Sequence, residues 1–251
     1  MAKLFEKTEL LNIDKHKNLK WECLKSDCSL SCCFLPKRSA ITLAEMPILS
    51  KYFPISFVLI KNKDENKEPF KSINIFFKLE EDEGRCTYLE LEKGCVLGNE
   101  KPLACKQYPF SLVLNDRGQK IINVDFSCPG FSFEKGEPIF GEDSQINQYF
   151  QKDFLIPADI FFERMRETQE FVNTMFNYNL VSPAEYHYRG ITVKLNAIDE
   201  SKLYDLPKET LKDFQLRGYF RYIYLHLYSI DNYKKLIDKF LEEKSKVNTV
   251  G

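Results

Sequence analysis

Eight cysteines lie between residues 23 and 128, and no cysteine follows them. Thiols at this density are typical of either a disulfide framework or a metal site. Because four thiolates around one centre favour Zn²⁺ or an iron–sulfur cluster, all eight are candidate metal ligands. They are Cys23, Cys28, Cys32, Cys33, Cys86, Cys95, Cys105 and Cys128.

The choice between disulfides and metal depends on the compartment. The N-terminus has no apolar run of signal-peptide length, and no segment approaches the ~18 apolar residues of a membrane-spanning helix. We therefore expect a cytoplasmic protein with no membrane partner. Thiols stay reduced there, so the pattern favours metal over disulfides. The cofactor that we expect is an iron–sulfur cluster or iron, with zinc as the alternative.

Composition excludes one class of partner. The chain has 36 Lys and Arg against 37 Asp and Glu, a formal net charge of −1, and its basic residues are spread along the sequence. Nucleic-acid binding needs a clustered basic surface, so we expect no nucleic-acid partner. With 251 residues, 43% of them hydrophobic, the chain can build a core without disulfides.

The adjacent pair Cys32 and Cys33 is unusual among thiol sites. Neighbouring side chains point to opposite faces of an extended segment and diverge by about 100° in a helix. The pair therefore predicts one ligand with one supporting thiol, or two thiols that serve different metals. The spacings match neither zinc fingers nor ferredoxins. Eight ligands also exceed the four of one structural zinc, which favours a cluster or two centres.

One predicted hairpin brings two cysteines together. Residues 110–114 and 120–126 are the expected strands of a hairpin and flank a turn of the sequence Asn-Asp-Arg-Gly. Cys105 precedes this hairpin and Cys128 follows it, so antiparallel pairing places both at the same end. Three residues near these cysteines are candidates for supporting or substrate contacts because they flank ligands: Lys106, Tyr108 and Asp125.

The other elements predict an α+β fold. Strands are expected at 55–60 and 72–79, and a capping box at Thr42 and Glu45 begins a short helix. Helical spacing appears after residue 140, where His187 is expected in a loop and His226 in a helix. The result is a cysteine-rich metal-binding region at 1–140 with a hairpin and short helices, then a mainly helical region at 141–251, or one merged domain. The expected helices are 144–152, 158–178, 208–229 and 231–244.

The cysteine motifs together resemble a known family. The order C-x4-C-x3-C-C, G-R-C, G-C-x-L, K-P-x2-C-K-x-Y-P-F and C-P-G over residues 21–131 is similar to the YkgJ-type CxxCxxCC cysteine-cluster family, described as zinc- or iron-chelating. Flagellin lysine N-methylases share that scaffold. The first gaps here are four and three residues rather than two. Lys101 and Lys106 stand where the family usually has Arg, which weakens any bidentate contact.

The resemblance implies a metal centre and, through the methylases, S-adenosylmethionine as cofactor and a protein lysine as substrate. The chain has no G-x-G turn, so such a cofactor would need the metal centre or another pocket. Three functions stay open on this reasoning. The first is a metalloenzyme modifying a protein or small substrate, the second a structural zinc with a partner-binding helical region, and the third a metal-handling protein.

Overall fold

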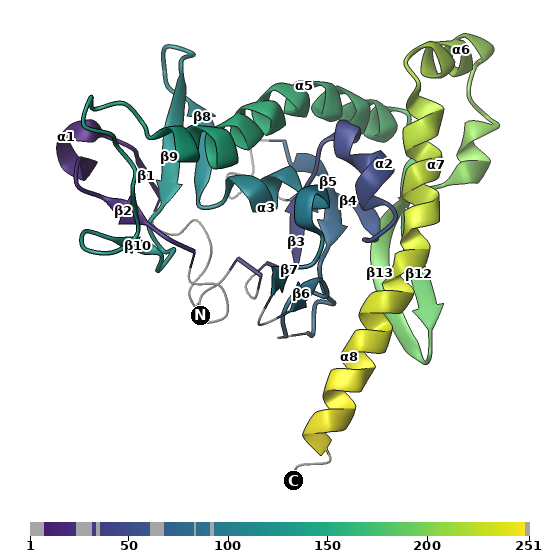
Figure 1. The fold of residues 1–251 in the computed structure, drawn as a ribbon. Coiled ribbons are helices and arrows are strands. Elements are labelled where there is room, and N and C mark those ends of the chain that lie inside the picture. Colours follow the sequence, from purple (N-terminus) through teal and green to yellow (C-terminus); the bar gives the residue numbers. More distant parts are fainter. Residues whose placement is uncertain are drawn as a thin grey trace. The chain divides into compact units, whose positions relative to one another are not determined.

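The computed structural model describes residues 8–23, 32–33, 36–60, 68–82, 84–90 and 93–248, with side chains to residue 245. Cys28 lies outside the described residues. The chain forms two compact units (Figure 1). Unit 1 comprises 1–36 and 88–163, and unit 2 comprises 37–87 and 164–251. These units differ in composition from the expected regions 1–140 and 141–251, because residues 37–87 join the C-terminal part of the chain. Whether those two regions differ in function stays a prediction.

Unit 1 contains the predicted hairpin. Strands β8 (Phe110–Leu114) and β9 (Lys120–Asp125) pair antiparallel, and β1 (Thr8–Leu10) adds to the far edge of β9. Asn115 closes the turn, since its side-chain oxygen accepts from the backbone N–H groups of residues 117 and 119. Gly118 completes it with a φ of 72°, a conformation that glycine adopts without strain. The hairpin prediction is confirmed, with β9 one residue shorter than expected.

A second small sheet in unit 1 centres on β2 (Lys20–Trp21), which pairs with β10 (Phe131–Ser132) and β11 (Glu137–Pro138). The backbone approaches itself closely here. A Cβ atom on Gly130 would lie 2.2 Å from the carbonyl oxygen of Glu22, so only glycine fits. The remaining elements of unit 1 are short: α1 (Ile13–His16), β6 (Leu89–Glu90), β7 (Gly94–Cys95), η3 (Gly98–Glu100), α3 (Leu103–Gln107), α4 (Gln148–Phe150) and the π-helical η4 (Gln151–Leu155).

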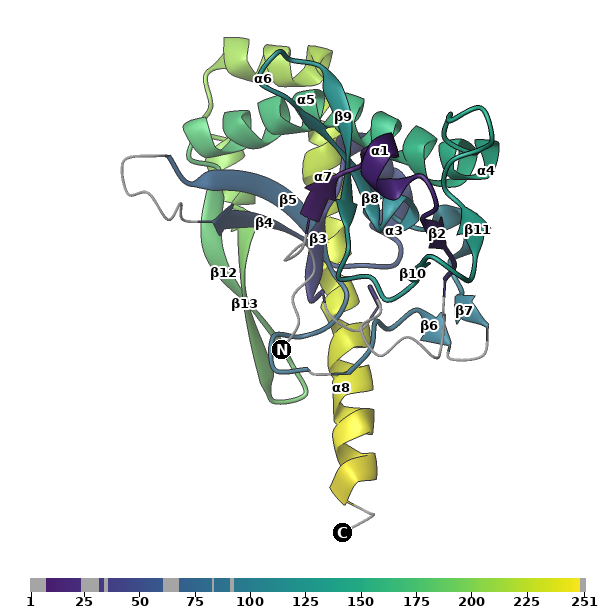
Figure 2. The same cartoon turned by 90° about the vertical axis from the view of Figure 1, so that its left-hand side faces the viewer.

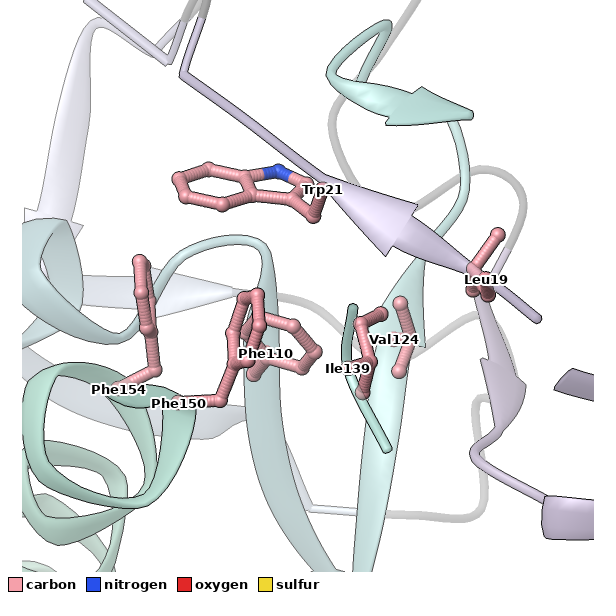
Figure 3. Packing of buried hydrophobic residues seen from close by; sticks show 7 residues of the cluster. All are labelled: Leu19, Trp21, Phe110, Val124, Ile139, Phe150 and Phe154. Atoms are coloured by element: carbon pink, nitrogen blue, oxygen red, sulfur yellow. The ribbon is translucent and has the colours of Figure 1, made fainter. Parts of the chain in front are cut away.

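An aromatic core holds these short elements together (Figure 3). The indole of Trp21 meets the ring of Phe154 edge to face, with centroids 4.9 Å apart, and Phe110 meets Phe154 at 5.4 Å. Edge-to-face pairs are worth about 0.5–1.5 kcal/mol beyond the area that they bury. The core therefore fixes β2, β8 and the π-helical segment relative to one another. Its buried members are Leu19, Trp21, Phe110, Val124, Ile139, Phe150 and Phe154.

Unit 2 contains two further sheets (Figure 2). In the first, β5 (Phe70–Phe76) lies between β3 (Arg38–Ala40) and β4 (Ile55–Ile60). The strand expected at 55–60 is confirmed, and the one expected at 72–79 begins and ends earlier. The second is a long hairpin of β12 (Val181–Tyr188) and β13 (Ile191–Ile198). His187 lies on β12 rather than in the expected loop.

The helices that the sequence predicts in unit 2 are present, but they begin and end at other residues than expected. The capping box is present: Glu45 accepts from the N–H and hydroxyl of Thr42, both at 2.9 Å. Helix α5 runs from Ile156 in unit 1 to Asn177 in unit 2 and tolerates Pro157 in its first turn. The helix expected at 208–229 is interrupted at Gly218, whose φ is 68°. The remaining helices are η2 (Leu43–Glu45), α2 (Met46–Leu49), η5 (Glu200–Leu203), α6 (Lys208–Leu216), α7 (Tyr219–Ser229), η6 (Ile230–Asn232) and α8 (Tyr233–Asn248).

The α+β class with a helical C-terminal region is thus confirmed. Within the described part of the chain, no helix has the length and apolar character needed to cross a bilayer. Unit 2 has its own core, in which the buried imidazole of His226 is hydrogen-bonded to both β4 and β13. Its Nε2 accepts from the N–H of Ile198 at 3.1 Å, and its Nδ1 lies 2.9 Å from the carbonyl oxygen of Ile55.

Candidate functional site

Six cysteines of unit 1 line one cavity of about 440 Å³. They come from five separate segments, and none of the seven described cysteines is joined in a disulfide. Cys86 belongs to unit 2 and is not among the described residues that line the cavity. The lining thiols are Cys23, Cys32, Cys33, Cys95, Cys105 and Cys128.

The hairpin positions two of these thiols. Cys105 lies on α3 before β8, and Cys128 follows β9, so both reach the same cavity at the open end of the hairpin, opposite its turn. Cys128 is further fixed by its backbone N–H, which donates to the carbonyl of Asp125 at 3.1 Å. The indole N–H of Trp21 donates to the Cys128 sulfur at 3.5 Å. The aromatic core therefore supports the cavity wall directly.

Cys32 and Cys33 behave differently from the sequence expectation. They occupy a turn, and both side chains line the same cavity rather than serving opposite faces. The Cys32 thiol donates a hydrogen bond to the Cys33 sulfur, which together with the nearby Lys101 ammonium lowers the pKa of Cys33 to about 7. The same bond, with burial, raises the pKa of Cys32 well above its usual range. Cys33 is thus the thiol that ionises first, beside a neighbour that keeps its proton.

Lys101 also acts on a second thiol. Its ammonium opposes the effect of burial on Cys95, although burial is the larger influence and raises the pKa of that thiol. Cys33 and Cys95 also act on each other electrostatically. The segment of residues 93–106 therefore supplies two thiols, Cys95 and Cys105, and the cation that acts on Cys33.

The three residues expected beside the cysteines have separate places. Tyr108 and Lys106 line the cavity, whereas Asp125 is fully buried and is not among the described lining residues. Asp125 accepts from the backbone N–H of Ser127 at 3.0 Å and interacts with the phenol of Tyr108. Burial, with the charges of Cys128 and Asp125, raises the pKa of Tyr108 well above its usual range. Tyr108 therefore stays a neutral phenol at the cavity wall.

Sequence reasoning missed the aromatic wall of the cavity. It consists of Trp21, Tyr149 and Phe154. Trp21 stands two residues before Cys23, and that proximity is a signal that could have found it. Tyr149 and Phe154 are more than 20 residues from the nearest cysteine in the sequence, so no local pattern connects them to the site.

The structure contradicts the prediction of a metal cluster. Across the described ranges, no group of three or more His, Cys, Asp or Glu side chains is arranged to hold a metal ion. The thiols share a cavity of about 440 Å³ without gathering around one point within it. The prediction of a metal-cluster enzyme is therefore wrong. Binding of a metal ion or of S-adenosylmethionine by individual residues stays an untested prediction.

The comparisons with known proteins point to another family than the motifs did. No curated protein and no solved structure matches the chain. A family model described as SapC matches residues 11–236, nearly the whole chain, whereas the cysteine motifs covered only 21–131. The assignment to the YkgJ-type family is thus wrong, and the lysine methylation that it implied loses its basis. The chain belongs to the SapC family.

Proposed function

We propose that unit 1 carries out thiol–disulfide exchange in the thiol-lined cavity. The observation that supports this most is the convergence of six thiols from five segments on one cavity next to an aromatic wall. Reversible exchange needs a thiolate, a second thiol within reach and access for a substrate disulfide. Cys33 and Cys32 supply the first two requirements, and the cavity supplies the third.

The reaction balances without another reagent. The Cys33 thiolate attacks one sulfur of a substrate disulfide, forming a mixed disulfide and releasing the other sulfur as a thiolate that takes a proton from water. A second cavity thiol then loses its proton to water and attacks the Cys33 sulfur, which releases the rest of the substrate as a thiolate that is protonated in turn. Two protein thiols are oxidised to one disulfide, and the substrate disulfide is reduced to two thiols.

Two features of the site favour this chemistry. A thiol with a pKa near ambient pH is the best attacking group, because it is largely ionised yet still nucleophilic. Cys32 is the natural second thiol, since it already donates a hydrogen bond to Cys33. Cys105 acts electrostatically on Cys32, lines the same cavity and is the other candidate second thiol. We place this activity in the cytoplasm, where disulfides are transient and belong to catalysis or redox sensing.

The test is a trapping experiment with 2-hydroxyethyl disulfide on the full chain. Mass spectrometry of the wild type should show rapid consumption of the reagent, with loss of two hydrogen atoms (two protons and two electrons) from the protein and no lasting adduct. Cys33→Ser should react at least tenfold more slowly. Cys32→Ser combined with Cys105→Ser should accumulate a stable mixed disulfide at Cys33, because both candidate second thiols are then missing.

Cys86→Ser is the matched control, because Cys86 does not line the cavity among the described residues, and it should react as the wild type does. Circular dichroism of each variant separates misfolding from lost chemistry. A Cys33→Ser protein that is folded and reacts at the wild-type rate would overturn the proposal. So would stoichiometric zinc or iron that blocks these thiols in the protein as purified.

A further inference from the structure

Two lysines that have no carboxylate partner in the described part of the chain line the thiol cavity. Lys101 and Lys106 are both half-buried, and Lys106 donates to the backbone carbonyl of Asn99 at 2.6 Å, which leaves its charge in place. Among the described residues, no carboxylate lies within 4.0 Å of either ammonium group, the distance that defines an ion pair. Lys93 also lines the cavity, but it is paired with Glu90 at 2.7 Å and is largely exposed.

The negative charges of the cavity are placed where water screens them. Its two acidic lining residues, Glu22 and Asp153, are exposed and are sequence neighbours of the aromatic residues Trp21 and Phe154. Exposed charges are weakened by solvent and salt more than half-buried ones. The field acting at the thiols is therefore dominated by the lysines of residues 101–106, next to Cys95, Cys105 and the turn that carries Cys33.

We infer that the cavity selects disulfides that carry a negative charge, with a carboxylate of the substrate held by Lys101 and Lys106 while its disulfide bond lies at Cys33. This inference rests on the proposed exchange reaction and adds the class of substrate. The aromatic wall accepts the apolar part of such a molecule, since Trp21, Tyr149 and Phe154 line the same cavity. A low-molecular-weight dicarboxylate disulfide meets all three requirements.

The expected difference in rate follows from the Coulomb energy of a charge contact near a protein surface. One additional favourable charge contact near a protein surface changes a rate by about fivefold, and two such contacts change it by up to about twentyfold. The preference should weaken as ionic strength rises, because the lysines are only half-buried.

The experiment compares three probes of different charge: 3,3′-dithiodipropionate (anionic), 2-hydroxyethyl disulfide (neutral) and cystamine (cationic). Each rate of reaction with the wild-type protein is divided by the rate of the same probe with a small neutral thiol, which removes differences in intrinsic reactivity. We expect the normalised rates to fall from the anionic to the neutral to the cationic probe, with at least a fivefold difference between the first two in low salt.

Variants show whether the lysines are responsible. Lys101→Gln should lower the ratio of the anionic to the neutral normalised rate about fivefold; this ratio cancels any change in the ionisation of Cys33, which affects all probes alike. Lys101→Arg should keep the wild-type ratio because it keeps the charge. Lys106→Gln should have a smaller effect of the same sign. Lys93→Gln is the matched control and should change little, because the charge of Lys93 is already compensated by Glu90.

The outcomes separate the inference from the function that it rests on. Equal normalised rates for all three probes, with fast reaction at Cys33, would overturn the charge selection and leave thiol–disulfide exchange standing. Slow reaction of every probe in a folded protein would overturn the exchange itself. An anionic preference that survives Lys101→Gln and Lys106→Gln together would also reject the assignment to these lysines.

Discussion

The buried imidazole of His226 should make unit 2 sensitive to mild acid. Its side chain has no exposed surface, and burial lowers its pKa to about 4. Because Nε2 accepts a hydrogen bond from the Ile198 N–H, the proton of the neutral ring is on Nδ1 and is donated to the Ile55 carbonyl. Protonation of Nε2 would place its N–H donor against the N–H donor of Ile198, which breaks this hydrogen bond and with it the link between β4 and β13.

The sign and size of the change in folding stability with pH follow from the difference in proton binding between the folded and unfolded chain. The unfolded chain binds a proton at this histidine near pH 6.5, whereas the folded protein binds it only near pH 4. The contribution is therefore fully present above pH 6.5 and is lost progressively as the pH falls from 6.5 to 4. Each pH unit inside this window is worth about 1.4 kcal/mol, so lowering the pH from 7 to 5 should cost about 2 kcal/mol.

The assay is urea unfolding of the wild type and of His226→Gln at pH 7, 6 and 5. Other groups titrate in this range, so the informative quantity is the difference in pH dependence between the two proteins. The wild type should lose about 2 kcal/mol more than His226→Gln between pH 7 and 5. His187→Gln replaces an exposed histidine and is the matched control, which should keep the wild-type pH dependence.

A difference below about 0.5 kcal/mol between the wild type and His226→Gln would refute the reasoning. Gln could also prevent folding at a site with no exposed surface. NMR titration of the wild type covers that case, because the ring signals of His226 should stay constant from pH 7 to pH 5. A midpoint near pH 6.5 would contradict the buried neutral state.

Two further predictions concern unit 1. The rate of alkylation by iodoacetamide at Cys33, followed by peptide mass mapping, should rise with pH to a midpoint near 7, because the Cys32 hydrogen bond and the nearby ammonium favour its thiolate; a midpoint near 8.5 would contradict this. Gly130→Ala should destabilise unit 1 by about 2–4 kcal/mol in thermal or urea unfolding, since its Cβ would lie 2.2 Å from a backbone oxygen that cannot move aside. In Gly141→Ala the nearest atom to the new Cβ is a side-chain oxygen at 3.0 Å and the nearest backbone atom is at 3.7 Å, so this variant serves as the control, with a cost under about 1 kcal/mol.

Local patterns in the sequence determined several elements of this protein. The hairpin at 110–125 was predictable because two short β-prone segments and a turn ending in Gly118 both depend on neighbouring residues alone. The capping box at Thr42 and the strand at 55–60 were predictable for the same reason. The clustering of thiols also indicated that cysteine chemistry lies in the first half of the chain.

The long hairpin of β12 and β13 shows a local signal that was present but overlooked. Residues 191–198 alternate apolar and polar, and Arg189 and Gly190 both have positive φ, as a tight hairpin turn requires. Pro183 lies within β12 although proline is disfavoured inside sheets. It is tolerated because β12 has a strand on one side only, so the missing N–H costs no ladder bond on the other.

The site itself was decided by tertiary structure. Adjacent cysteines diverge in regular helix or strand, but the turn at Cys32 and Cys33 directs both thiols into one cavity, and no periodic pattern reports a turn of this kind. The cysteine motifs likewise could not distinguish a shared metal from a shared cavity. That distinction depends on where the thiols stand around Trp21, Tyr149 and Phe154, which the sequence separates and only the packing of the core brings together.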